Sequence, residues 1–144
     1  MTFFYSFILK SLSMKKILIV EDERPIARSF ELKLVNAGFE TKTAANGQEA
    51  LALLEKEKFD LIFLDLIMPI QNGFRVLEIL KSRNNATPVV VTSSLGQTVD
   101  VEHAKSLGAK DYFIKTDVGL ASIVSYAKRI LETDAEGPKD VHAA

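Results

Sequence analysis

Short apolar runs alternate with amphipathic stretches along most of this chain, and no other feature restricts its fold as strongly. Three runs are apolar on both faces: KILIV at 16–20, LIFL at 61–64 and PVVVT at 88–92. Such runs are typical of the central strands of a parallel sheet, which helices cover on both sides. Shorter strands are predicted at 39–45 and 111–114, which makes five strands in all.

A helical pattern follows each predicted strand. The first begins near Pro25, which a first helical turn tolerates, and continues to Gly38, a residue type that commonly ends helices. The others are predicted at 47–58, 74–80, 99–107 and 120–131. Because strands and helices alternate strictly, we expect an α/β protein, a doubly wound (βα)5 chain whose parallel sheet carries helices on both faces.

The chain has 144 residues, which suits one compact domain, and its regular pattern places that domain at 14–132. Residues 1–13 are expected to be a disordered extension, with a weak membrane-surface or partner anchor as the alternative. Their apolar run at 3–9 is too short to span a bilayer, which takes ~20 residues. Residues 133–144 are polar, have nothing to bury, and are predicted to be a disordered tail.

The charges of the chain are balanced, with 18 basic and 19 acidic residues and a formal net charge of -1. Broad nucleic-acid binding shows as a basic patch or stripe, so no nucleic-acid partner is expected. The absence of cysteine excludes disulfides and thiolate metal sites in this sequence. It is also compatible with a reducing compartment, and a cytoplasmic location is expected.

Charged and hydroxyl side chains stand directly after four of the predicted strands. In chain order they are Glu21, Asp22 and Glu23, then Asp65, then Ser93 and Ser94, and finally Lys115. In open parallel sheets, ligands bind at the carboxyl ends of the strands. We therefore expect these side chains to meet at one edge of the sheet and to form a binding site there.

The grouped carboxylates indicate a cation site. They repel one another, and each is costly to desolvate without a counter-charge. Mg²⁺ is commonly held by one or two carboxylates together with phosphate oxygens. Each residue type also has a structural alternative: acids favour the amino end of a helix, Asp65 can pair with Lys115, and serines can cap the next helix. The joint position of all these residues at one edge favours a site.

Four motifs in this order resemble the receiver domain of two-component response regulators, over a stretch from about Lys15 to about Leu131. They are ILIVEDE at 17–23, LIFLDLIMPIQNGFRVL at 61–77, VVVTSSLG at 89–96 and GAKDYFIK at 108–115. The resemblance implies a flavodoxin-like sheet with the strand order 2-1-3-4-5.

By this resemblance, Asp65 is the residue that accepts a phosphoryl group, and Mg²⁺ is the cofactor. The implied ligands of Mg²⁺ are Asp22, Asp65 and the backbone carbonyl of Ile67, with Glu21 acting through a metal-bound water. Apolar side chains at Ile67 and at Leu95 are implied to hinder an attacking water, and so to lengthen the lifetime of the phosphoryl group.

The last two strands are implied to supply the phosphoryl-binding groups, namely the Ser93 hydroxyl, the Ser94 N–H and the Lys115 ammonium. Ser93 is preferred to Thr92 because its separation from Lys115 matches that of the family. Tyr112 takes the position of the switch aromatic, with a passive core aromatic as the alternative. The residue after the lysine departs from the family, because Thr116 stands where proline is usual, and the loop there is expected to differ.

The function implied is that of a single-domain response regulator, and not of a conventional enzyme. The donor is a histidine kinase or a histidine phosphotransfer protein, which in the family contacts the side of the first helix where Pro25, Ile26 and Ser29 lie. Nothing foldable follows Leu131, so the output is expected to be a contact with a target protein. The implied surface for it is the face shared by the last two helices and the last strand.

Other classes fit these residues less well. A haloacid-dehalogenase-like phosphatase needs a second acid where Ile67 stands. A flavodoxin-type FMN binder or a Rossmann protein needs a phosphate-binding loop where EDERP occupies 21–25. A receiver-like interaction module that is never phosphorylated is the alternative left open, although a missing acceptor or acidic pair, its usual mark, is not found.

Overall fold

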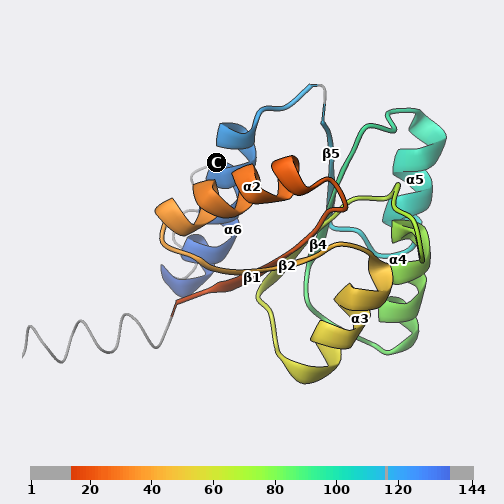
Figure 1. The fold of residues 1–144 in the computed structure, drawn as a ribbon, viewed down its shortest axis with the longest axis horizontal. Helices are drawn as coiled ribbons and strands as arrows, with labels where there is room; N and C mark the ends of the chain where they lie inside the picture. The colour runs from red at the N-terminus through yellow and green to blue at the C-terminus, as the bar shows by residue number, and fades with distance from the viewer. Residues whose placement is uncertain (1–13, 116, 137–144) are drawn as a thin grey trace, which may run out of the picture.

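The computed structural model describes residues 14–115 and 117–136. Five parallel strands form one sheet in the order β2-β1-β3-β4-β5 (Figure 1). The strands are β1 (Lys16–Val20), β2 (Glu40–Ala44), β3 (Leu61–Leu64), β4 (Val89–Ser93) and β5 (Asp111–Ile114). The predicted flavodoxin-like order is confirmed, with its topological switch point between β1 and β3.

Helices cover both faces of this sheet. Among the described residues they are α2 (Arg24–Asn36), α3 (Gly47–Lys56), α4 (Gly73–Ser82), α5 (Thr98–Ser106) and α6 (Leu120–Glu136). One core cluster joins the sheet to α2 and α6, and a second joins its other face to α3, α4 and α5 (Figure 1). The predicted doubly wound arrangement is therefore confirmed.

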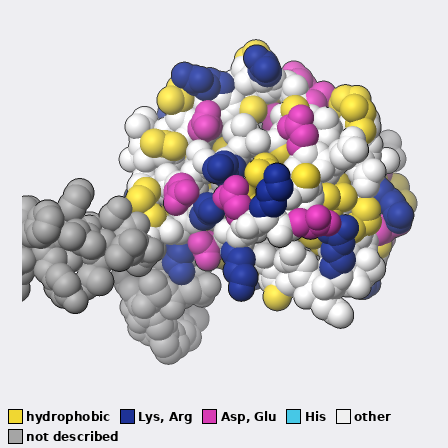
Figure 2. All heavy atoms as spheres, turned by 60° about the horizontal axis from the view of Figure 1, so that its bottom comes forward, with side chains coloured by type: hydrophobic (Ala, Val, Ile, Leu, Met, Phe, Trp, Pro, Cys, Tyr) yellow, Lys and Arg dark blue, Asp and Glu magenta, His cyan; other side chains and the backbone are white. Residues whose placement is uncertain are grey.

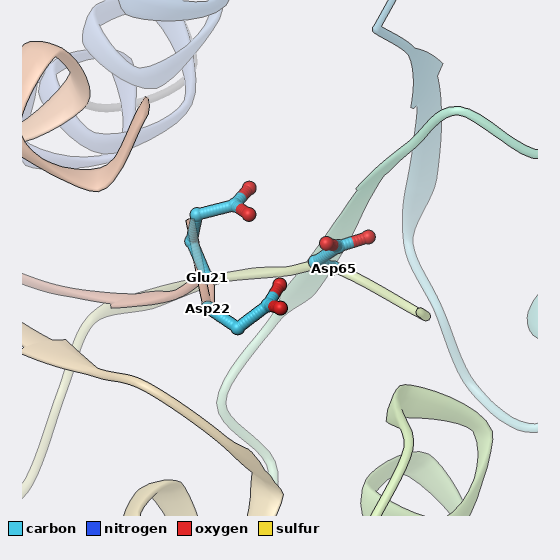
Figure 3. Close-up of side chains that lie close together, drawn as sticks. All are labelled: Glu21, Asp22 and Asp65. Carbon is cyan, nitrogen blue, oxygen red and sulfur yellow. The ribbon is translucent and has the colours of Figure 1, made fainter. Parts of the chain in front are cut away.

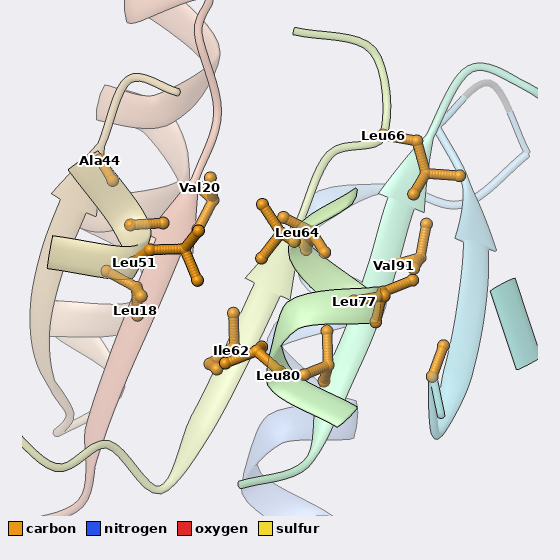
Figure 4. Packing of buried hydrophobic residues seen from close by; sticks show 14 of the residues in the cluster. Leu18, Val20, Ala44, Leu51, Ile62, Leu64, Leu66, Leu77, Leu80 and Val91 are labelled. Atoms are coloured by element: carbon orange, nitrogen blue, oxygen red, sulfur yellow. The ribbon is translucent and has the colours of Figure 1, made fainter. Parts of the chain in front are cut away.

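The central strand β3 supplies both cores. Phe63 points toward α2, where its ring centroid lies 4.9 Å from that of Phe30. Ile62 and Leu64 belong to the opposite cluster, together with Leu77 of α4 (Figure 4). A strand that is buried on both faces needs apolar residues at every position, which explains the uninterrupted LIFL run.

The register of the sheet brings the carboxyl ends of the strands together. Val20 at the end of β1 pairs with Ala44 of β2 and with Leu64 of β3. Ser93 at the end of β4 pairs with Ile114 of β5. The residues that follow these positions therefore leave the sheet along one edge.

Several element boundaries differ from the prediction, and the largest difference is at the end of α6. β4 includes Ser93, because the N–H of Lys115 donates to the Ser93 carbonyl at 2.8 Å and extends the ladder. α6 continues past the predicted end at Leu131 to Glu136, so 133–136 belong to this helix. Extending an existing helix costs little, because each added residue gains one hydrogen bond. A polar composition alone therefore predicted the end of this helix too early.

The predicted extension 1–13 and the last part of the predicted tail, 137–144, lie outside the described residues. Within the described part of the chain, no helix is both long enough and apolar enough to cross a membrane. On the face drawn in Figure 2, basic and acidic side chains are interspersed, in keeping with the balanced charge of the sequence.

Replacing Phe63 with alanine is expected to lower the free energy of unfolding by about 3–5 kcal/mol. The ring is 1% exposed and packs against Phe30, so the change leaves a cavity. Leu32→Ala is the matched control, because Leu32 is exposed on α2 and its loss should cost less than about 0.5 kcal/mol. Urea unfolding followed by circular dichroism compares the two, and equal losses would contradict the assigned core.

Candidate functional site

Backbone hydrogen bonds continue past the strand ends and fix two of the acidic residues. The N–H of Glu21 donates to the carbonyl of Ala44 at 3.0 Å, and the N–H of Asp65 donates to the carbonyl of Val20 at 3.0 Å. Each acid is therefore held by a neighbouring strand, and its position follows from the register of the sheet.

Three carboxylates form a cluster at this edge. Glu21, Asp22 and Asp65 each offer one oxygen, and these oxygens lie within 4.8 Å of one another (Figure 3). Glu21 and Asp65 are each only 4% exposed, whereas Asp22 is half-buried. Hard carboxylate oxygens that converge in this way match the ligand preference of Mg²⁺. The donor set therefore fits a divalent cation.

Lys115 lies against the same cluster. Its Nζ donates to Glu21 Oε1 at 2.6 Å and to Asp65 Oδ2 at 3.3 Å. The predicted contact between Lys115 and Asp65 is present, but the closer carboxylate is that of Glu21. When all four groups are ionised, three carboxylates and one ammonium leave two negative charges. The cluster can therefore accommodate a further cation.

The pKa shifts of these groups follow from burial and from their mutual charges. Burial raises the pKa of Glu21 and of Asp65, and the neighbouring carboxylates add to this, while Lys115 opposes it. Burial lowers the pKa of Lys115, but the hydrogen bond to Glu21 and the charge of Asp65 outweigh it, so this pKa lies above its ordinary value. The ammonium is therefore a permanent positive charge at neutral pH.

Of the structural alternatives for these residues, the structure contains the ion pair but not the predicted serine cap. The N-cap of α5 is Gln97, so neither of the predicted serines caps that helix. Glu23 is the N-cap of α2, but its side chain makes no capping hydrogen bond. The ion pair between Asp65 and Lys115 exists. It does not argue against a site, because a positive charge beside the reacting group is also what a phosphoryl-transfer site needs.

Ser93 and Tyr112 meet at the backbone of Leu95. Ser93 is fully buried and its Oγ accepts a hydrogen bond from the Leu95 N–H at 3.2 Å. The Tyr112 hydroxyl donates to the Leu95 carbonyl at 2.7 Å. Burial raises the pKa of Tyr112, and a side-chain hydrogen bond with Ser93 acts in the opposite direction. Tyr112 is thus turned inward, whereas Ser94 is exposed.

The two positions expected to control the phosphoryl lifetime differ in exposure. Ile67 is 51% exposed, and its N–H donates to Asp65 Oδ1 at 3.2 Å. Leu95 is half-buried and packs against the core on the α4 side of the sheet. Thr116, where the family usually has proline, lies outside the described residues.

The predicted docking residues lie in the first two turns of α2, directly after the acidic pair. Pro25 and Ser29 are exposed and Ile26 is half-buried. A cleft of about 610 Å³ runs between this helix and the start of α3, and Glu21, Asp22 and Pro25 line part of it. The acidic cluster is therefore approached along α2.

Sequence reasoning missed two basic residues at this cleft. Arg24 and Arg28 also line it, and they lie about one helical turn apart on α2. A pair of basic residues spaced by four, directly after the acidic pair, is the signal that could have identified them. They bring positive charge to the approach to the carboxylates.

The family model of the response regulator receiver domain matches residues 17–128. The chain belongs to this family. The "Probable transcriptional regulator ycf27" of Porphyra purpurea is 38% identical over 101 residues, which cover 70% of this chain and 41% of that protein. A CheY-like receiver domain protein from Methanospirillum hungatei is 28% identical, with a TM-score of 0.78, and the match covers 87% of this chain and 100% of that chain. TrrA of Thermotoga maritima, solved with Mg²⁺ and BeF, is 27% identical, with a TM-score of 0.72 and coverages of 82% and 100%.

Membership of the family places this receiver domain in two-component signal transduction, where such domains interact with histidine kinases and bind Mg²⁺ through acidic residues. The chain spans about half the length of the curated relatives it matches, several of which are named as transcriptional regulators. The prediction that nucleic acid is not a partner is therefore not supported. The stand-alone organisation stays a prediction.

Asp22→Ala is expected to weaken Mg²⁺ binding by roughly tenfold or more, a range typical for loss of a metal-site interaction. Asp22 belongs to the carboxylate cluster, whereas the adjacent Glu23 is exposed and lies outside it. Glu23→Ala is therefore the matched control and should bind Mg²⁺ nearly as well as the wild type. Titration of amide resonances with Mg²⁺ measures both, and equal losses would mean that the acidic run acts only as a diffuse field.

Proposed function

We propose that this receiver domain accepts a phosphoryl group from the phosphohistidine of a partner protein onto Asp65, with Mg²⁺ bound, as a cytoplasmic signalling protein. One observation supports this most strongly. The Asp65 carboxylate is held at a strand end, 4% exposed, with two further carboxylates beside it and the Lys115 ammonium 3.3 Å away. A buried acid in such a setting is poised for charge-dependent chemistry.

In the proposed reaction, a carboxylate oxygen of Asp65 attacks the phosphorus atom. An O–P bond forms as the P–N bond to the donor histidine breaks, and the electron pair of that bond stays on the imidazole nitrogen, which takes up a proton. The product is an aspartyl phosphate. Phosphoryl transfer depends on positioning and charge neutralisation more than on covalent machinery.

The positive charges of the site would serve this reaction. The Lys115 ammonium lies 3.3 Å from Asp65 Oδ2 and can offset charge on a phosphoryl oxygen. Bound Mg²⁺ would supply a second positive charge, with Asp22, Asp65 and the Ile67 carbonyl as ligands and Glu21 reached through water. The same donor set that repels itself in the free protein would thus be neutralised in the loaded one.

The signal would leave the site through Ser93 and Tyr112. The Ser93 Oγ accepts a hydrogen bond from the Leu95 N–H, so the Ser93 hydroxyl proton can be donated to another group. At present it is shared with the Tyr112 side chain. A phosphoryl oxygen on Asp65 would compete with Tyr112 for that proton and would also accept a hydrogen bond from the Ser94 N–H. The Tyr112 ring would then be held by the Leu95 carbonyl, and the face formed by α5, β5 and α6 would change its equilibrium.

The donor would be a histidine kinase or a histidine phosphotransfer protein. His103, the one histidine among the described residues, is exposed on α5 and stacks on Phe74 with ring centroids 4.6 Å apart. It lies on a helix of the opposite face from α2. Pro25, Ile26 and Ser29 are the proposed contacts of the donor, because they lie in the first two turns of α2, directly after the acidic pair, and Pro25 lines the cleft beside it.

With Mg²⁺ and acetyl phosphate, the protein is expected to gain one phosphoryl group, and Asp65→Asn is expected to gain none, because a neutral amide is a poor nucleophile. Asp100→Asn on α5 is the control and should be labelled like the wild type. EDTA should suppress labelling. Mass spectrometry of the intact protein measures each case. Undiminished labelling of Asp65→Asn would remove Asp65 as the acceptor.

Ile26→Glu is expected to slow transfer from the cognate kinase by roughly tenfold or more, since 1.4 kcal/mol of lost contact is tenfold in affinity. Labelling by acetyl phosphate, which needs no docking, should be unchanged. Leu32→Glu is the matched control, because Leu32 is exposed farther along the same helix. Transfer rates from purified kinase compare the variants. An unimpaired Ile26→Glu would place the donor elsewhere.

The phosphoryl group is expected to be long-lived, because neither Ile67 nor Leu95 can orient an attacking water. Combining Ile67→Asn with Leu95→Glu should accelerate hydrolysis roughly tenfold or more, if one oriented water contact is worth about 1–3 kcal/mol. Decay of the purified phosphoprotein with Mg²⁺ present measures both forms. Equal decay rates would show that these positions do not set the lifetime.

A further inference from the structure

The loop between β3 and α4 begins at the proposed acceptor Asp65 and contains an unusual turn. Ile70 and Gln71 have φ angles of 48° and 69°, in the left-handed region that favours glycine. Such a conformation is strained for a residue such as isoleucine and persists only where the surroundings impose it. The Ile70 side chain is 61% exposed, so its own packing does not hold the turn.

The first residue of α4 holds one end of this loop. A Cβ on Gly73 would lie 2.4 Å from the Asp65 carbonyl oxygen and 2.7 Å from the Leu66 Cα, which no side chain could tolerate. The N–H of Gly73 also donates to the Leu66 carbonyl at 3.0 Å. The start of α4 therefore touches the backbone of the acceptor residue itself.

The first residue of α3 holds the turn from the other side, although it is distant in sequence. A Cβ on Gly47 would lie 2.4 Å from the Gln71 carbonyl oxygen, 2.9 Å from the Gln71 Cβ and 2.7 Å from Val76 Cγ2. Helix α3 lies beside α4 (Figure 1). Only a residue without a side chain allows α3 to approach the left-handed turn this closely.

The start of α3 is itself firmly fixed. Asn46 Oδ1 accepts a hydrogen bond from the Glu49 N–H at 2.9 Å, and Glu49 Oε1 accepts one from the Ala45 N–H at 2.9 Å. This reciprocal arrangement resembles a capping box, which anchors the first turn of a helix. Gly47 therefore presents a rigid backbone surface to Gln71.

We propose that Gly47 is a positioning residue for the acceptor site. It touches neither the carboxylates nor the incoming phosphoryl group. Gly47 fixes the turn at Gln71, and this turn leads into Gly73, which contacts the backbone of Asp65. The position of the loop in turn determines where the Ile67 N–H lies, which donates to the Asp65 carboxylate. The inference rests on the proposed function for its effect on phosphorylation, but its effect on the geometry of the acidic cluster is independent of that function.

Gly47→Ala is expected to lower the rate of labelling by acetyl phosphate roughly tenfold or more, because small displacements of reacting groups are costly. It should also weaken Mg²⁺ binding and shift the amide resonances of Asp65, Leu66 and Ile67. Gly119→Ala is the matched control, because a Cβ there meets nothing within 4 Å, and it should behave like the wild type. All variants are compared at a temperature at which their melting curves show them folded.

Two further variants separate positioning from general destabilisation. Ile123→Ala removes a buried side chain of α6 on the opposite face of the sheet, and should lower stability while leaving Mg²⁺ affinity unchanged. Gln71→Gly removes one of the three close contacts, the Cβ at 2.9 Å, and lets the backbone of the turn shift without strain, so the double variant should recover part of the lost labelling and Mg²⁺ affinity. If Gly47→Ala alone does not fold, the labelling and Mg²⁺ affinity of the double variant are compared with those of Gln71→Gly alone.

Wild-type labelling and Mg²⁺ affinity in Gly47→Ala would overturn the inference, as would equal losses in Ile123→Ala. If the wild-type protein binds Mg²⁺ but is not labelled, the proposed function fails, and the Mg²⁺ titration and amide shifts still decide on Gly47. If the wild-type protein shows neither activity, unchanged amide shifts of the acceptor loop in Gly47→Ala would overturn it.

Discussion

The Lys115 ammonium lies between two buried carboxylates, and the rest of the site depends on this contact. Glu21 and Asp65 are each 4% exposed, and a carboxylate buried this far without a partner costs several kcal/mol. Lys115 offsets that cost at 2.6 Å and 3.3 Å, but it cannot neutralise both acids and Asp22 as well. The fold is thus stable enough to hold the acids together and still leaves them a net negative charge. A site that binds a cation reversibly needs both properties.

The sheet makes this contact possible through its strand order. Glu21 follows β1 and Lys115 follows β5, and two other strands, β3 and β4, lie between these two. The salt bridge therefore spans the sheet edge above Asp65, which follows β3. Only a long, flexible cation on the outer strand can reach that far, and the parallel register determines that it arrives at the same edge as the acids. The site is a consequence of topology as much as of residue type.

The features of the fold and the site that depend on local sequence patterns could be predicted, whereas those that depend on tertiary contacts could not. Runs such as LIFL identify buried strands because burial on both faces leaves no polar position, and the strands predicted before Ser93 and Lys115 placed both residues at strand ends. Which carboxylate Lys115 prefers could not be predicted, since strand position fixes an edge but not the path of a side chain. The contact between Gly47 and Gln71 is a tertiary one with no periodicity to reveal it. The end of α6 was predicted too early, because the polar composition of a segment does not show that a formed helix can be extended at a low free-energy cost.

The helix with the fewest buried residues, α5, follows Ser93 and Ser94, two of the proposed phosphoryl-binding residues. In the described part of the chain, α2 and α3 each contain three buried residues and α4 contains four. In α5, only Ala104 is buried. Elements with few buried apolar contacts shift at low free-energy cost. The segment that enters α5 carries Leu95, whose backbone binds both Ser93 and Tyr112. A change in the hydrogen bonding of Ser93 therefore acts on the helix that shifts at the lowest free-energy cost. This favours α5 and its neighbours as the surface that responds to the site.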